Sequence, residues 1–532
     1  MSKTQTFIAL AAGCAALAIA SPAAAKDCSE MVGLKLDAIG GGGGKVDAAT
    51  LVAPGAFQPP AGFGPPPGVA NAAYKNLPSF CRVQATLTPT ADSDIKVEVW
   101  LPTDAWNGKL VGIGNGVWAG SISYSEMGPT LAQGYAVVAT DTGHKGTGLT
   151  AEWAVGHPEK LVDFGHRAIH LMTVTAKAAI KDYYGSGPKY SLWNSCSTGG
   201  RQGLMLAQRY PEDYDAISSK APANPMTDLM TQSMWMATAA NMAGSTRLTP
   251  ALLGMVHKAA VASCDAKDGL ADGLIGNPQA CTFKAAALIC KAGQADGCLN
   301  ADQAKAVQAF YDGVTDKSGK KILPGWPVGS EMQLATLIMG KDPFPVANDY
   351  FRLLVHANDK GWDWKTMDYG AETQIARAYG AEILNVTPQG LNAFFKRGGK
   401  LLLSHGWTDG LIPASNTVKF YGDLQKIAPK AVQAKQLRLF MVPGMDHCGG
   451  GEGPSSYDTL GTIDAWASTG TPPERIVASR GGAAAGGPPG APGAPALPPM
   501  SRPLCPFPQL ATWDGKGDKA NAASFSCAAA KK

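Results

Sequence analysis

The 532-residue sequence is poor in charged residues, and it lacks clusters of one sign. Charged residues make up 17% of it, the 46 Lys and Arg nearly balance the 42 Asp and Glu, and no run of basic residues concentrates positive charge. Nucleic acids and anionic membrane surfaces attract proteins through such concentrated charge. We therefore expect neither of them to be a partner of this protein.

The sequence also lacks a hydrophobic run that could cross a membrane. The apolar stretch 7–20 is about 14 residues long, and no later stretch reaches the roughly 20 residues that a spanning helix needs. Lys3 precedes this stretch and small residues follow it at 21–25, which is typical of a secretory signal peptide. We predict that residues 1–25 are this signal, and that the protein is secreted or periplasmic without a membrane anchor.

No two cysteines have the Cys-x-x-Cys spacing that seeds many zinc sites. Of the 11 cysteines, Cys14 lies in the predicted signal, and the remaining ten form an even set in a chain expected to be exported. Such a set indicates five disulfides. The alternatives are scattered free thiols or a metal site, and the sequence alone does not give the pairing.

Apolar, strand-like runs alternate with helical stretches along much of the chain. Helical spacing of apolar residues at 167–183 predicts a helix between two such runs, and a second helix should follow Ser197 and extend toward Arg209. This alternation is typical of an α/β fold with a mostly parallel sheet that is covered on both faces. The predicted strands are residues 96–101, 109–113, 136–140, 190–193, 400–404 and 437–442.

The pattern changes between residues 219 and 396, where Met-rich and Ala-rich helical segments, four close cysteines and an acidic loop occur. We predict that residues 219–396 form an inserted lid domain over one edge of the sheet. This insertion splits the core domain into residues 26–218 and 397–532. The Gly-rich run 40–44 and the Gly/Pro-rich run 481–499 are expected to be flexible, because their composition cannot build a core.

Residues 193–200 lie between a predicted strand and a predicted helix, where an α/β-hydrolase fold places its nucleophile elbow. The motif of this turn is Gly-x-Ser-x-Gly, and here Ser195 replaces the first glycine. Serine is small enough for so sharp a turn, so we assign Ser197 as the nucleophile. The N–H of Thr198 then faces the developing oxyanion at the positive end of the helix. The alternative is a plain glycine-rich turn.

α/β-Hydrolases place the acid and then the histidine after the serine along the chain. Asp409 and His447 each follow a predicted strand, at the sheet edge where such folds carry their sites. We expect His447 to act as general base and Asp409 to orient it, which completes a catalytic triad with Ser197. Asp446 is a rival acid, although a sequence neighbour of the histidine usually points away from its ring. His405 is a rival base, for which we favour a place in the substrate pocket or in the packing.

A cysteine adjoins each of the two reacting residues. Cys196 immediately precedes Ser197, and Cys448 immediately follows His447. A disulfide between them would tie the two catalytic loops together and close a chain loop of about 250 residues, which the chain-entropy model values at about 4–5 kcal/mol. The alternative is two unrelated buried cysteines.

Two further loops carry groups that can support such a site. Residues 112–116 are rich in glycine but lack the spacing of a dinucleotide-binding loop, so we expect them to supply a second oxyanion N–H near Gly116. Asp265, Asp268 and Asp272 lie among glycines within one short loop, and calcium prefers such oxygen-rich turns. A solvated acidic turn is the alternative.

Together these residues resemble the tannase and feruloyl esterase family, whose signature joins a Cys-Ser elbow, a distant Asp and a His-Cys pair. The resemblance extends over nearly the whole mature chain. Two positions depart from the family's pattern, namely Ser195 before the Cys-Ser pair and Gly410, where family members often have proline. The motifs that carry the resemblance are residues 106–109, 114–116, 140–144, 163–165 with Ala168 and His170, 196–201, 409–413, 447–448 and 502–506.

The resemblance implies that Ser197, Asp409 and His447 form the triad and that Cys196 is bridged to Cys448. It also implies a structural calcium ion in the lid. The ligands that it assigns to this ion are the side chains of Asp265, Asp268 and Asp272 and the carbonyl groups of Leu270 and Leu274. The remaining disulfides that it suggests, together with short sequence separations, are Cys28–Cys81, Cys264–Cys281, Cys290–Cys298 and Cys505–Cys527.

As a function, the resemblance implies a serine carboxylic ester hydrolase that acts on small esters of aromatic acids, with feruloyl or other hydroxycinnamoyl, galloyl or terephthalate-like acyl groups. His405 and Ile412 are expected to line the substrate pocket. Trp362 and Trp364 of the lid could stack on the aromatic ring, although such side chains more often belong to a core. The alternatives are an amidase or peptidase on the same fold, or a secreted binding protein without catalysis. The oligomeric state does not follow from the sequence.

Overall fold

The computed structural model describes residues 25–36, 39, 43–60, 74–241, 247–294, 296–481 and 497–529. The predicted signal peptide, apart from Ala25, lies outside these ranges, as do most of run 481–499 and part of run 40–44. Within the described ranges, no helix is both long enough and apolar enough to cross a bilayer.

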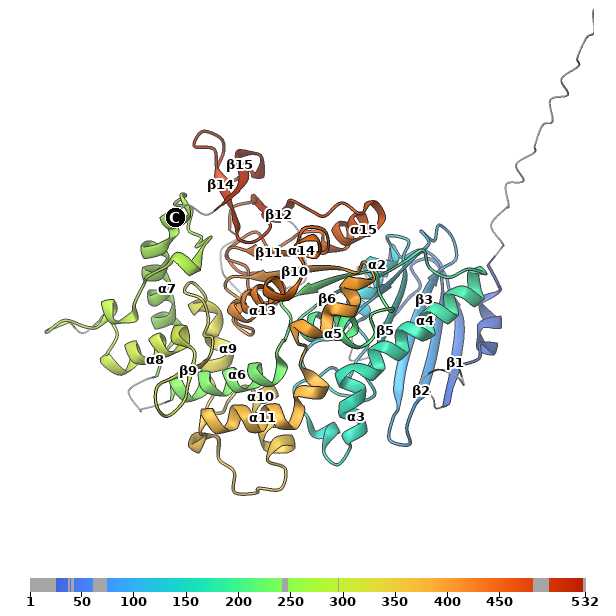
Figure 1. The fold of residues 1–532 in the computed structure, drawn as a ribbon, viewed down its shortest axis with the longest axis horizontal. Helices are drawn as coiled ribbons and strands as arrows, with labels where there is room; N and C mark the ends of the chain where they lie inside the picture. The colour runs from blue at the N-terminus through green and yellow to red at the C-terminus, as the bar shows by residue number, and fades with distance from the viewer. Residues whose placement is uncertain are drawn as a thin grey trace, which may run out of the picture.

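Nine strands of the described chain form the central sheet (Figure 1). Along one part of this sheet, neighbouring strands pair in parallel, in the order β5, β4, β6, β7, β10 and β11. At the other edge, β1, β2, β3 and β5 pair antiparallel. The predicted α/β fold with a mostly parallel sheet is thus confirmed. In spatial order the strands are β1 (Gly43–Val52), β2 (Phe80–Thr88), β3 (Ile95–Pro102), β5 (Ala136–Thr140), β4 (Lys109–Gly112), β6 (Tyr190–Cys196), β7 (Ala216–Lys220), β10 (Lys400–Gly406) and β11 (Leu437–Val442).

Helices cover both faces of the sheet because successive strand residues point to opposite sides. In β10, Leu401 and Leu403 belong to the apolar cluster on one face, and Leu402 belongs to the cluster on the other. The helices on the first face are α4 (Ala168–Tyr184), α5 (Thr198–Arg209), α13 (Ala414–Ile427) and α14 (Lys430–Gln436), and those on the second are α2 (Tyr124–Leu131) and α15 (Thr459–Thr469).

The segment between β7 and β10 is mostly helical, and Figure 1 shows it in green to orange. Because β7 and β10 are parallel neighbours, this segment is an insertion between adjacent strands. One of its two apolar clusters includes Trp118 and Phe164 of the core, so the insertion packs on the core. Its elements are α6 (Met226–Ala240), α7 (Pro250–Cys264), α8 (Ala301–Asp312), β8 (Val314–Thr315), β9 (Lys321–Leu323), α9 (Ala335–Ile338), α10 (Pro345–Asp349), α11 (Tyr369–Leu384) and α12 (Asn392–Lys396).

Two small antiparallel strand pairs and a short helix lie outside the sheet and the insertion. The strand pairs follow β11 and form the end of the chain, and the short helix precedes α4. Their bounds are β12 (Ile476–Arg480) with β13 (Met500–Leu504), β14 (Gln509–Trp513) with β15 (Phe525–Ala529), and α3 (Pro158–Val162).

Five disulfides join the ten cysteines of the described residues, and their pairing is the expected one. The Cα atoms of the pairs are 4.9–5.9 Å apart, as disulfide geometry requires. The pairs are Cys28–Cys81, Cys196–Cys448, Cys264–Cys281, Cys290–Cys298 and Cys505–Cys527.

The antiparallel half of the sheet contains a buried carboxylate that several donors share. Glu98 on β3 is 2% exposed. It accepts hydrogen bonds from Arg82 Nε (2.9 Å), Trp100 Nε1 (2.9 Å), Tyr124 Oη (2.8 Å) and Gln84 Nε2 (3.2 Å). A single side chain therefore satisfies four polar groups at this end of the molecule.

We predict that Glu98→Ala lowers the free energy of unfolding by about 2–4 kcal/mol, because it leaves a guanidinium and two ring donors without their acceptor. The matched control is Asp94→Ala, which removes an exposed ion pair with Lys96 (2.6 Å) and should change that free energy by less than about 1 kcal/mol. Denaturant unfolding of both variants measures the difference. Equal losses would contradict the role assigned to Glu98.

Candidate active site

Ser197 occupies a sharp turn between a strand and a helix. β6 ends at Cys196, α5 begins at Thr198, and Ser197 between them has φ 64° and ψ −126°. A residue with a side chain is strained in this conformation, and such strain is often found at functional sites. Hydrogen bonds hold the turn on both sides, from Ser197 N to Lys220 O (3.0 Å) and from Ala223 N to Ser197 O (3.1 Å).

The residues around Ser197 must be small because the chain is crowded there. A Cβ on Gly199 would lie 2.1 Å from Ser195 Oγ, and a Cβ on Gly200 would lie 2.4 Å from the carbonyl oxygen of Lys220. Ser195 itself is buried. A larger side chain at position 195 would collide with the first turn of α5, whereas serine fits.

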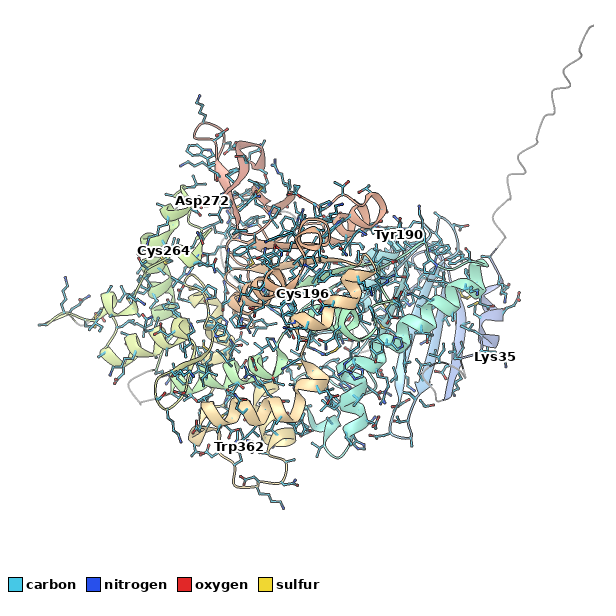
Figure 2. All side chains as sticks on the ribbon, viewed as in Figure 1. Lys35, Tyr190, Cys196, Cys264, Asp272 and Trp362 are labelled. Atoms are coloured by element: carbon cyan, nitrogen blue, oxygen red, sulfur yellow. A yellow bond between two sulfur atoms is a disulfide. The ribbon has the colours of Figure 1, made fainter. Side chains whose placement is uncertain are left out.

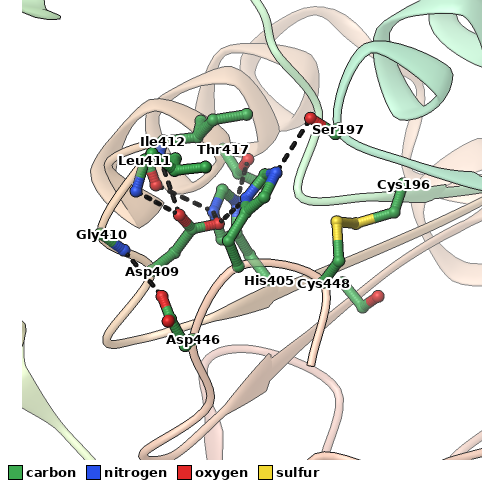
Figure 3. A network of polar contacts seen from close by, with 12 residues as sticks. Cys196, Ser197, His405, Asp409, Gly410, Leu411, Ile412, Thr417, Asp446 and Cys448 are labelled. Carbon is green, nitrogen blue, oxygen red and sulfur yellow. Dashed lines mark hydrogen bonds and ion pairs between the residues drawn. A yellow bond between two sulfur atoms is a disulfide. The ribbon is translucent and has the colours of Figure 1, made fainter. Parts of the chain in front are cut away.

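His447 and Asp409 form a hydrogen-bonded chain with Ser197 (Figure 3). Ser197 Oγ lies 2.9 Å from His447 Nε2, and His447 Nδ1 lies 2.8 Å from Asp409 Oδ2. Asp409 follows β10 and His447 follows β11, and the parallel pairing of these strands brings their carboxyl ends to one edge. The structure thus places the three residues singled out from the sequence in the geometry of a Ser-His-Asp triad.

The Asp409 carboxylate is completely buried but well supplied with partners. Its Oδ1 accepts hydrogen bonds from the backbone N–H groups of Leu411 (2.9 Å) and Ile412 (2.8 Å). Burial alone would raise the pKa of Asp409, but the charge of His447 and hydrogen bonds from His405 and His447 outweigh burial and hold this pKa below its ordinary value. Burial would lower the pKa of His447, but the Asp409 carboxylate outweighs it and raises that pKa.

Asp446, the rival acid, points away from the histidine ring. Its Oδ1 accepts a hydrogen bond from Gly410 N (3.1 Å), below the Asp409 carboxylate in Figure 3. The geometry therefore favours Asp409 as the partner of His447.

His405 does not lie in the substrate pocket; of the two places expected for it, the structure shows the one in the packing. Its side chain is completely buried, with Nε2 3.1 Å from both Asp409 Oδ2 and Ile412 O, and Nδ1 2.7 Å from Thr417 Oγ1. The reason is that His405 still belongs to β10, whose residues 401–406 are all buried under the helices. It holds the Asp409 carboxylate from behind, and it lies out of reach as a base for Ser197.

The Cys196–Cys448 disulfide joins the serine turn to the histidine loop, as Figure 3 shows. The Cα atoms of the two cysteines are 5.9 Å apart. Because each cysteine is the sequence neighbour of a reacting residue, this bond limits how far Ser197 and His447 can separate.

The loop after β4 packs against the first turn of α5. Thr198 Oγ1 donates to Val117 O (2.7 Å) and Gly199 N donates to Asn115 O (2.7 Å), which holds this loop beside Ser197. The N–H groups of Thr198 and Gly116 have no acceptor among the described residues. Both are thus free to donate to a ligand, and their place in an oxyanion hole stays a prediction.

A cavity opens beside Ser197 and His447, and most of its wall is apolar. Ile412 lines it, as expected. The lid supplies much of the wall, which the sequence analysis missed. Helical spacing in residues 226–233 marks one face of a helix, but no sequence pattern says what that face meets. The lid residues of the wall are Met226, Leu229, Met230, Ser233, Phe344 and Val346.

Trp362 and Trp364 do not line this cavity, so the idea that they stack on the substrate is not supported. Trp362 stacks on Phe351 and His356, with ring centroids 6.1 and 5.2 Å apart, and Trp364 is buried in a lid cluster. Figure 2 shows Trp362 at the margin of the molecule, well apart from Cys196. Packing within the lid accounts for both.

The acidic lid loop lies at another corner of the molecule, where Figure 2 labels Cys264 and Asp272. Burial, with smaller contributions from the charges of Asp272 and Asp265, raises the pKa of Asp268 to about 6, which a bound cation would oppose. However, Asp265 accepts hydrogen bonds from loop N–H groups and Asp272 contacts Arg502 (2.5 Å). No three Asp, Glu, His or Cys side chains of the described chain lie close enough to hold a metal.

The oxygen donors of this loop are therefore of the type that calcium prefers, but they do not converge on one point in this arrangement. The calcium ligands stay a prediction.

Comparisons with known proteins give the family. The sequence matches the family described as tannase and feruloyl esterase over residues 81–528. It is 32% identical to an uncharacterized esterase of Xanthomonas campestris, over 97% of this chain and 93% of that protein. It is also 32% identical to a probable feruloyl esterase B-2 of Aspergillus terreus, over 84% of this chain and 86% of that protein.

Solved structures agree. Feruloyl esterase B from Aspergillus oryzae is similar with a TM-score of 0.82 at 26% identity, over 94% of this chain and 99% of that chain. Tannin acyl hydrolase from Aspergillus niger shares the fold, with a TM-score of 0.74 at 18% identity over 96% of each chain. The chain therefore belongs to the tannase and feruloyl esterase family and is a carboxylic ester hydrolase.

Proposed function

We propose that this ester hydrolase cleaves esters of aromatic acids through a covalent acyl-enzyme on Ser197. The observation that carries the proposal is the continuous hydrogen-bonded chain from Ser197 through His447 to Asp409, beside an apolar cavity. The relatives named feruloyl esterase support an aromatic acid as the acyl group. Feruloyl or other hydroxycinnamoyl, galloyl and terephthalate-like groups are the candidates.

The reaction proceeds in two steps. Ser197 Oγ attacks the ester carbonyl carbon while His447 Nε2 accepts the serine proton, and this proton then goes to the leaving alcohol. Water, deprotonated by the same histidine, hydrolyses the acyl-enzyme and releases the acid. Asp409 stays ionised and stabilises the imidazolium, while N–H groups of Thr198 and near Gly116 donate to the oxyanion.

We further propose that the protein is secreted or periplasmic. Its five disulfides support this location, since such bonds persist in oxidising compartments.

A structural calcium ion in the lid is also part of the proposal. The side chains of Asp265, Asp268 and Asp272 would hold it with two backbone carbonyl groups, and its charge would offset the repulsion between the carboxylates. Its role is to fix the loop that the Cys264–Cys281 disulfide also closes.

We predict that Ser197→Ala lowers the turnover of methyl ferulate by at least about 10⁴-fold, because no other group can form the acyl-enzyme. Asp409→Asn should lower it by about 10⁴-fold, because it leaves His447 in the wrong tautomer. The matched control is Asp446→Asn, whose amide oxygen can still accept from Gly410 N and which loses only the carboxylate charge, so it should stay within about tenfold of the parent. Release of the free acid measures all three. An active Ser197→Ala, or a larger loss in Asp446→Asn than in Asp409→Asn, contradicts the triad.

We predict that kcat/KM falls as the pH drops through the pKa of His447, because only the neutral imidazole can accept the serine proton. Asp409 raises this pKa, so the acidic limb of the profile lies above the ordinary histidine value of about 6.5. The residual activity of Asp409→Asn should show this limb at lower pH. A limb at the same pH in the parent and the variant would show that another group controls it.

We predict that calcium added after chelation raises the melting temperature, because an ion that binds only the folded loop stabilises the protein by about 2.7 kcal/mol at 100 times its Kd. Asp268→Asn should lose most of this response, whereas Asp514→Asn, in an exposed turn, should keep it. Thermal unfolding and calorimetric titration measure the effect. No binding heat and an unchanged melting temperature would rule out the ion.

A further inference from the structure

One face of α6 lines the acyl cavity. Met226, Leu229, Met230 and Ser233 all contribute to the wall. Their spacing of three, four and seven residues places them on the same side of the helix. This face presents two thioethers, one aliphatic side chain and one hydroxyl to whatever occupies the cavity.

The helix leads away from the nucleophile. Ala223, just before α6, donates its N–H to Ser197 O (3.1 Å), so the start of this segment lies beside the reacting serine. Ser233 comes seven residues after Met226, which corresponds to about 10 Å of helix rise. The Ser233 hydroxyl, the one hydroxyl of this face, thus lies at the end of the face that is farthest along the helix from Ser197.

Ser233 is only 3% exposed and lines the cavity, and its hydroxyl has no hydrogen-bond partner among the described residues. Other polar side chains of α6 are paired. Thr231 Oγ1 donates to Thr227 O (3.2 Å), and Thr238 Oγ1 lies 2.6 Å from Tyr369 Oη. A hydroxyl left unpaired in an apolar wall is unfavourable, so a ligand oxygen at this point would be stabilised.

The rest of the wall offers little to a polar or charged ring. Apart from the reacting residues and Thr198, its side chains are apolar, and none of the described lining residues is Lys, Arg, Asp or Glu. A carboxylate that entered this cavity would lose its water without gaining a cation. A ring with three hydroxyl groups would have only the Ser233 hydroxyl of this wall as a hydrogen-bond partner for all three.

We propose that Ser233 selects the acyl group by a hydrogen bond to the para oxygen of a hydroxycinnamoyl ring. The proposal rests on the acyl-enzyme function above and narrows its substrates. The propenoyl spacer of a hydroxycinnamoyl group carries the para oxygen farther from the ester carbonyl than in a galloyl or terephthaloyl group, toward the distal end of the α6 face. The Met226 and Met230 thioethers pack against the ring.

The test compares methyl esters, so that the leaving alcohol is constant. Ser233→Ala should lower kcat/KM for methyl 4-hydroxycinnamate and methyl ferulate by about 3- to 10-fold, the value of one neutral hydrogen bond. It should change kcat/KM for methyl cinnamate, which has no para oxygen, by less than about twofold. Ser233→Thr keeps the hydroxyl and should retain the preference for the hydroxylated ester. Thr238→Ala, on the same helix outside the cavity, is the matched control.

A second experiment tests whether the cavity disfavours a carboxylate because its lining offers no cation. Dimethyl terephthalate and monomethyl terephthalate differ by one carboxylate, and the parent should cleave the charged ester at least about 100-fold more slowly. Methyl gallate should also be a poorer substrate than methyl ferulate. Faster cleavage of methyl gallate or monomethyl terephthalate than of methyl ferulate would overturn the assigned acyl group.

Failure of this proposal is distinguishable from failure of the acyl-enzyme function. p-Nitrophenyl acetate has an acyl group too short to reach Ser233, so its turnover reports the triad alone. If Ser197→Ala still cleaves it, the proposed function fails. If the parent cleaves it and Ser197→Ala does not, but Ser233→Ala affects hydroxylated and plain cinnamates equally or not at all, the role of Ser233 fails.

Discussion

Strands β6, β7, β10 and β11 run parallel and in step, with Cys196 opposite Lys220 and Lys220 opposite Ser404. Parallel strands end at the same edge, so the loops that follow β6, β10 and β11 meet there. Ser197, Asp409 and His447 come from these three loops, and the register brings them together across separations of up to 250 residues. The loop after β7 leads along this edge into α6, so the wall of the acyl cavity begins beside the nucleophile.

The site separates a polar half from an apolar half. A charged carboxylate as deeply buried as Asp409 is unfavourable unless it is fully hydrogen-bonded. Two backbone N–H groups and two histidines meet that need, which explains why His405 lies behind the triad. On the other side of Ser197, the cavity wall is almost entirely apolar. The charges of Asp409 and His447 are thus stabilised where the proton moves, and the acyl group contacts an apolar surface.

Local sequence patterns predicted the parts of this protein that local chemistry determines. Residues 136–140 and 437–442 are strands with the predicted bounds, because short, mostly apolar runs between turns suit a strand buried on both faces. The three triad residues could be predicted because each of them follows a strand within a recognisable turn. β7 was missed because it contains two serines, and the Ser219 hydroxyl donates to Gly200 O (2.8 Å) of α5, a contact that no local pattern shows. The antiparallel edge, the burial of His405 and the lid residues of the cavity likewise depend on contacts between distant segments, which no local pattern encodes.

The Cys196–Cys448 disulfide joins two turns that each contain a strained residue. Ser197 has φ 64° and Cys448 has φ 63°, and each such conformation costs about 1–3 kcal/mol in a residue with a side chain. A disulfide that closes a loop of this length is worth about 5 kcal/mol in the chain-entropy model, which is comparable to the two strains together. Hydrogen bonds from Ser197 N to Lys220 O and from Ala223 N to Ser197 O add to the restraint. The covalent link therefore helps to hold the strained turn of Ser197 and the strained residue that follows His447, because relaxing either turn would have to move the other.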